Sequence, residues 1–110
     1  MIELVIASVI PFAAMQTAAA DKARTALRTC IKSASEQAKS QKIPLDGFQD
    51  FVRAQCTAQE GGLKTAVWAF DSKNKVSRKQ SESDANMQIE DYLVTAKDHY
   101  ELATVPVKKE

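Results

Sequence analysis

Small and apolar residues recur every three or four positions along residues 21–41, which is the spacing of one face of an α-helix. This first stripe consists of Ala23, Ala26, Leu27, Cys30, Ile31, Ala34 and Ala38. A second stripe begins near residue 47 and consists of Phe48, Phe51, Val52, Cys56, Leu63, Val67 and Phe70. A third consists of Met87, Ile89, Tyr92, Leu93, Ala96, Tyr100 and Ala103. The pattern predicts three amphipathic helices.

Two turn signals separate these stripes. Pro44 cannot continue an upstream helix and pushes Ile43 out of helical geometry, so the first turn is expected there. Asp46 with Gln49 resembles a capping box and predicts that the second helix starts near Gly47. The polar segment 71–75 predicts the second turn.

The limits of the third helix follow from its caps. Either Ser77 with Gln80 or Ser81 with Asp84 has the spacing to cap its start. The helix is expected to end before Pro106, which leaves 106–110 as a disordered tail. Within the second helix, Gly61-Gly62 predicts either a kink with close approach of a neighbouring backbone, or only a weak point.

Composition supports the same fold class. The 110 residues include only three Gly and three Pro, which disfavours a turn-rich β architecture. The length suits one domain, expected over 21–105. The sequence therefore predicts an all-α protein, either a three-helix up-down-up bundle or an elongated helical hairpin with a third helix beside it.

Residues 1–20 have the anatomy of a signal peptide. No residue from Leu4 to Ala20 is charged, and Ala18 and Ala20 supply the small side chains that precede a cleavage site. The mature chain would begin at Asp21, which predicts a periplasmic or secreted protein. The alternative is an uncleaved membrane anchor, although Pro11 interrupts the apolar run and a spanning helix needs about 20 predominantly apolar residues.

Cys30 and Cys56 are the only cysteines, and each lies thirteen residues from Ile43. An antiparallel hairpin that turns at Ile43 brings the two cysteines to the same height, on stripes that face each other. An exported chain does not keep such thiols reduced, so we expect a disulfide that joins the first and second helices. A redox pair or a metal site is disfavoured, because the chain has no CxxC motif and no set of histidines.

Candidate chemistry is scarce. His99 is the only histidine, and Glu90-Asp91, the densest carboxylate pair, consists of neighbours that diverge on a helix. Phosphate-binding loops, G-x-S-x-G and haem attachment motifs do not occur. We therefore expect no catalytic residues, no metal and no cofactor. The aromatic residues of the second half belong either to the core or to a ligand groove between the second and third helices; they are Trp68, Phe70, Tyr92 and Tyr100.

Charge is nearly balanced, with 15 basic and 14 acidic residues, so bulk electrostatics do not favour nucleic acid. One local cluster around the second turn either binds an anion or partner, or is merely solvated; it consists of Lys73, Lys75, Arg78 and Lys79. A basic row of Arg24, Arg28 and Lys32 on the first helix has a counterpart in Asp84, Asp91 and Asp98 on the third. These rows either pair between helices, pair across a homodimer, or face solvent independently.

Together these features favour a small exported helical protein that is not an enzyme and that binds or supports another protein of the cell envelope. Two alternatives stay open. An envelope stress chaperone would bind unfolded clients after acid or heat treatment, and a subunit of a membrane complex would keep residues 1–20 as its anchor.

Overall fold

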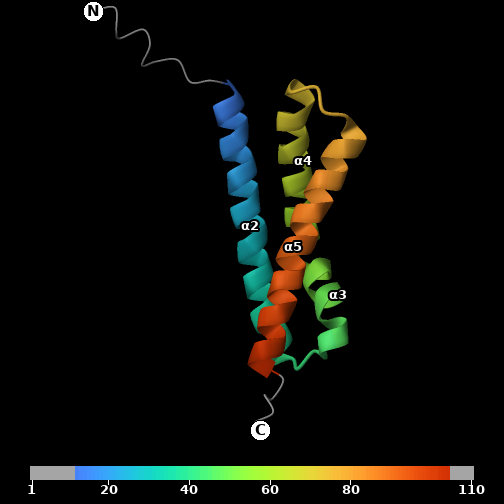
Figure 1. Ribbon diagram of the computed structural model, residues 1–110. Coiled ribbons are helices and arrows are strands. Elements are labelled where there is room, and N and C mark those ends of the chain that lie inside the picture. The colour runs from blue at the N-terminus through green and yellow to red at the C-terminus, as the bar shows by residue number, and fades with distance from the viewer. Residues whose placement is uncertain (1–11, 105–110) are drawn as a thin grey trace, which may run out of the picture.

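The computed structural model describes residues 12–104, with side chains from Thr17 onward. This part of the chain folds into α2 (Phe12–Ser40), α3 (Leu45–Gln55), α4 (Thr57–Lys73) and α5 (Arg78–Thr104), and it contains no strand. In Figure 1, α2 and α5 run in the same direction, while α3 and α4 return in the opposite one. The predicted up-down-up bundle is confirmed, with the second helix divided in two.

The core is made by the inner faces of all four helices. Its largest fully buried side chains are Leu27, Phe48, Val52, Leu63, Ile89 and Leu93. All six belong to the predicted stripes, because the three-and-four spacing holds wherever a helix has one covered side. Met87 was assigned to the wrong face: it is 64% exposed, and the inner row of α5 includes Ala85 instead.

The first helix is longer than expected. α2 begins at Phe12 and continues without a break through Ala20 and Asp21, the predicted cleavage point. The part of the leader before Phe12 and the predicted tail at 106–110 lie outside the described residues. Ala20 is buried, and the contiguous buried cluster of the bundle takes its α2 members from Leu27 onward, with the partly buried Ala23 packed against it.

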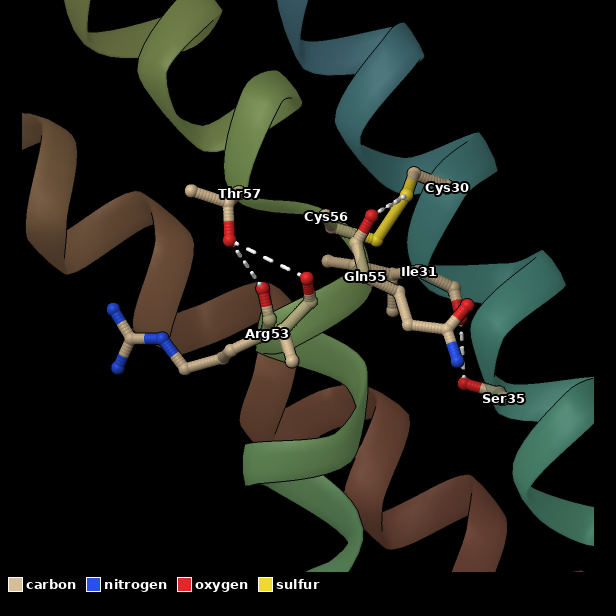
Figure 2. Close-up of a disulfide and its surroundings, with 8 residues drawn as sticks. Cys30, Ile31, Ser35, Arg53, Gln55, Cys56 and Thr57 are labelled. Carbon is tan, nitrogen blue, oxygen red and sulfur yellow. Dashed lines mark hydrogen bonds between the residues drawn. A yellow bond between two sulfur atoms is a disulfide. The ribbon is translucent and has the colours of Figure 1, made fainter. Parts of the chain in front are cut away.

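The disulfide between Cys30 and Cys56 is present, with 5.9 Å between the Cα atoms (Figure 2). It joins the middle of α2 to the junction of α3 and α4, so the argument from equal distances to Ile43 is confirmed. Such bonds persist in oxidising compartments, and the disulfide therefore indicates an environment outside the reducing cytosol.

The second helix is interrupted at Cys56, while α4 runs without a break through Gly61-Gly62, so of the two alternatives for the glycines the structure favours the weak point. Cys56 leaves helical geometry at φ −112° and ψ 22°, and the hydroxyl of Thr57 donates to the Arg53 carbonyl at 3.0 Å. Both glycines lie inside continuous α4, where a Cβ atom would meet nothing within 4 Å. No neighbouring backbone approaches them, and they are only a weak point of the helix.

Helix caps explain both turns. Lys42 and Lys75 adopt left-handed backbone conformations, with φ 58° and 63°. The next residue in each turn, Ile43 or Val76, donates its N–H to a carbonyl five residues earlier, which closes the preceding helix. Ser77 caps α5 by accepting the Gln80 N–H at 3.1 Å, as predicted.

The cap predicted at Asp46 was wrong. Pro44 is the residue that precedes α3, and Asp46 lies in the first turn of that helix. Pro44 has its φ fixed near the helical value and lacks an N–H, so the helix can begin at the residue after it. The carboxylate of Asp46 instead lies near the positive end of the helix dipole.

Tyr100 fixes the last turns of α5 against the first turn of the bundle. Its hydroxyl donates to the Ile43 carbonyl at 2.6 Å and lies 3.2 Å from the Ala38 carbonyl, at the end of α2. Its ring stacks on Phe48 with 4.3 Å between centroids. The disulfide does not include α5, and this buried tyrosine instead sets how α5 lies beside α2.

Candidate functional site

A constant register relates the two parallel helices α2 and α5. Nε of Arg24 donates to Oε1 of Gln88 at 2.7 Å, and the guanidinium of Arg28 lies 5.7 Å from the centroid of the Tyr92 ring. The two residues of each pair are 64 positions apart in sequence, so successive turns of α2 lie beside successive turns of α5. Near the C-terminal ends of both helices, the hydrogen bond from Tyr100 to the Ala38 carbonyl keeps α5 beside α2.

Between these contacts lies a groove of about 680 Å³, which we call the α2–α5 groove. Its apolar lining comes from both helices and consists of Ile31, Tyr92, Ala96, Tyr100 and Ala103. Ser35, Thr95 and His99 add a few polar groups. The volume lies within the range of known ligand sites, which are mostly apolar with a small number of polar groups.

The rim of the groove on α2 is positively charged. Arg28, Lys32 and Lys39 line it together with one acidic residue, Glu36, and all four are exposed. None of these cations forms an ion pair with a described residue. The groove therefore combines an apolar lining with a net positive edge that no other part of the described chain neutralises.

The aromatic residues are divided between two places. Tyr92 and Tyr100 line the groove, whereas Trp68 lies under the Arg78 guanidinium, 5.0 Å from it, and Phe70 is half-buried. Of the two alternatives for these residues, the core holds Tyr100, and the groove that Tyr92 and Tyr100 line lies between the first and third helices and not between the second and third. The constant register explains this, because it places one face of α5 along α2.

The predicted basic cluster surrounds the turn between α4 and α5, at the opposite end of the bundle from the turn between α2 and α3 (Figure 1). All four side chains are exposed; they belong to Lys73, Lys75, Arg78 and Lys79. Arg78 is engaged by Trp68 and by Glu82, whose carboxylate lies 3.4 Å away. Of the four, only Lys79 lines either of the two pockets described here, and binding of an anion or partner by this cluster stays a prediction.

The two predicted charge rows do not pair within the molecule. Arg24 binds Asp21 and Gln88, and Arg28 stacks over Tyr92. Asp84 accepts a hydrogen bond from Gln80 at 2.8 Å, while Asp91 and Asp98 form no ion pair with a described residue. The acidic row lies on a part of α5 that does not face α2.

Sequence reasoning missed a charged contact at the Cys56 break. Arg53 reaches Glu60 across the interruption at 3.3 Å and Glu90 of α5 at 3.1 Å. The Glu60 side chain is only 11% exposed. Its hydrogen bond is the main cause that raises the pKa of Arg53 above the ordinary value. This contact joins α3, α4 and α5.

The groove was also missed, although one signal for it is visible in the sequence. Arg28, Lys32 and Lys39 share one helical face, and Tyr92, Ala96 and Tyr100 share another at a spacing of four. Only the register between α2 and α5 shows that these two faces adjoin.

Within residues 12–104, no group of three or more metal-ligating side chains comes together, and no helix has the length and hydropathy of a membrane span. Comparisons with protein-family models, curated proteins and solved structures found no match to this chain.

Proposed function

We propose that this chain is an exported, non-catalytic binding module of the cell envelope, and that the α2–α5 groove receives an acidic amphipathic helix of a partner protein. The observation that carries the proposal is the combination of an apolar lining with three cations and one anion on the rim. An acidic amphipathic helix offers the complementary surface, with apolar side chains for the lining and carboxylates for the rim.

The dimensions of the groove suit a helix. Arg28 and Lys39 are eleven residues apart, which corresponds to about 16 Å along α2, or three helical turns. Two parallel helices leave a depression in which the apolar face of a third helix can lie. Exposed cations along one edge would fix the orientation and accelerate the encounter more than they raise affinity.

Export is supported by the disulfide and by the leader anatomy of residues 1–20, which together favour a periplasmic or secreted protein. Every groove residue, both cysteines and the buried cluster follow Asp21 in the sequence. Removal of residues 1–20 would therefore leave the proposed site complete. Intact-mass measurement of the natively exported protein tests this part, since an uncleaved chain would contradict it.

The binding site is tested with a labelled 18-residue amphipathic peptide of leucine, alanine and glutamate, measured by fluorescence anisotropy on the oxidised protein. We expect binding, and we expect the same peptide with lysine in place of glutamate not to bind. The variant Lys32→Glu/Lys39→Glu should raise the dissociation constant of the glutamate peptide at least about tenfold, because two rim charges are reversed.

The matched control is Lys22→Glu/Lys75→Glu, which makes the same change in net charge at two exposed positions outside the groove. It should change the affinity less than about twofold, because separated exposed charges are largely screened at physiological salt. Equal weakening by both variants would show that binding depends on overall charge and would refute the groove as the site.

A further inference from the structure

The outer face of α5 carries a second unusual surface, which we call the α5 ridge. It consists of Asp84, Met87, Asp91, Val94, Asp98, Glu101 and Leu102. The three apolar members are 64%, 47% and 72% exposed and are the large hydrophobic side chains that the described chain leaves most accessible. Four carboxylates lie among them, and they are flanked by Lys79, which lines a shallow pocket with Met87 and Asp91, and by Lys97, which adjoins Val94 and Glu101. The ridge is thus itself one face of an acidic amphipathic helix.

We infer that the occupant of the α2–α5 groove is the α5 ridge of a second copy of this chain. This inference rests on the proposed function, in which the groove receives an acidic amphipathic helix. It accounts for two features with one contact: the unpaired cations of the groove rim and the exposed apolar side chains of the ridge.

Charge spacing supports the match. Lys32 and Lys39 are seven residues apart, as are Asp91 and Asp98, so each pair spans about 10.5 Å along its helix. Within one molecule these groups do not meet, because α2 faces Gln88 and Tyr92 of α5 instead. Pairing between two molecules brings the equally spaced charges together.

The geometry permits a closed dimer. Thr95, which lines the groove, is four residues after Asp91 and three before Asp98, so it adjoins both on the surface of α5. The groove and the ridge therefore form one continuous strip along the helix. Two copies related by a twofold axis can lay their α5 helices antiparallel, so that each ridge enters the groove of the other.

The test is analytical ultracentrifugation of the oxidised full-length protein and of charge-reversed variants. We expect the wild type to dimerise and the dimer to weaken with added salt, because exposed charge pairs are screened. The groove variant Lys32→Glu/Lys39→Glu and the ridge variant Asp91→Lys/Asp98→Lys should each be monomeric. Circular dichroism verifies that both remain folded, which is expected because all four positions are exposed.

Mixing these two variants is the sharpest part of the experiment. Both contacts of the dimer regain opposite charges in the mixture, so a one-to-one heterodimer should form. The protein with all four substitutions should form a homodimer again. The control Asp46→Lys/Asp50→Lys has the charge of the ridge variant but changes exposed positions of α3, so it should not pair with the groove variant.

Three outcomes would overturn the inference: a wild type that stays monomeric up to about 1 mM, a dimer that survives both reversals, or a mixture that stays monomeric. If the wild type is monomeric but the leucine–glutamate peptide still binds, the occupant is a foreign helix and only the inference fails. If neither the peptide nor a second copy binds, the proposed function fails as well.

Discussion

Reduction of the Cys30–Cys56 disulfide should greatly destabilise the protein. The bond closes a loop of 26 residues between α2 and the junction of α3 and α4. In the chain-entropy model, a loop of this length lowers the stability of the unfolded chain by about 3.5 kcal/mol at 25 °C. That is a large share of the roughly 5–15 kcal/mol by which small domains are stable. For a domain of this size, the melting temperature should fall by roughly 15–25 °C.

The assay is thermal unfolding followed by circular dichroism at 222 nm, with and without dithiothreitol. Reduction of the wild type isolates the bond better than substitution does, because Cys56 is fully buried and its truncation would also leave a cavity. The matched control is Cys30→Ala/Cys56→Ala, in which dithiothreitol should have no effect. A shift below about 3 °C in the wild type would show that the bond contributes little stability, and two reactive thiols in natively exported protein would show that the bond is not formed there.

Three further changes test other parts of the fold by urea unfolding. Arg53→Leu should destabilise the protein by about 1–3 kcal/mol, because it leaves the nearly buried Glu60 carboxylate without its partner. The double variant Arg53→Leu/Glu60→Leu should recover part of this loss of stability. If the losses from the two single variants add up in the double variant, the pairing is contradicted. Gly61→Ala should stabilise the protein by about 0.5–1 kcal/mol, since the added Cβ atom meets no atom within 4 Å. A destabilised variant would reveal a close neighbour of this position. Tyr100→Phe should lower the free energy of unfolding by about 1–2 kcal/mol, because the hydrogen bonds to the Ile43 and Ala38 carbonyls are lost. An unchanged urea midpoint would show that these bonds contribute nothing to stability.

The hairpin was predictable because its determinants are local. Pro44 ends the helical pattern, and the positions of Cys30 and Cys56 then follow by counting along two helices of known rise. The cap at Ser77 was predictable for the same reason, since it needs only the Gln80 N–H three residues later. In both cases a few neighbouring residues determine the geometry.

The break at Cys56 was not predictable, because no Gly or Pro marks it. Gly61-Gly62 carries the stronger local signal, yet α4 continues through it, since each glycine costs only about 1 kcal/mol in a helix. At Cys56 the disulfide to α2 and the Arg53–Glu60 contact across the break are tertiary interactions. Tertiary packing here overrides local preference.

The groove escaped prediction for a related reason. Its position depends on which face of α5 turns toward α2, and this rotation is set by contacts such as Tyr100 with Phe48 and Ile43, which are far apart in sequence. The same rotation leaves Met87 outside and places Ala103 in the groove. Periodicity finds the faces of each helix, but only tertiary contacts decide which faces meet.

The most direct test of the central claim is site-specific photo-crosslinking in native cells. A photoreactive phenylalanine analogue replaces Thr95 in the groove, and Thr65 on the exposed side of α4 serves as the control position. We expect irradiation at Thr95 to yield one adduct, in which mass spectrometry identifies the attached segment as an acidic amphipathic helix. Loss of this adduct in Lys32→Glu/Lys39→Glu is also expected. No adduct at Thr95, or the same adducts from both positions, would contradict the assignment of the groove as the binding site.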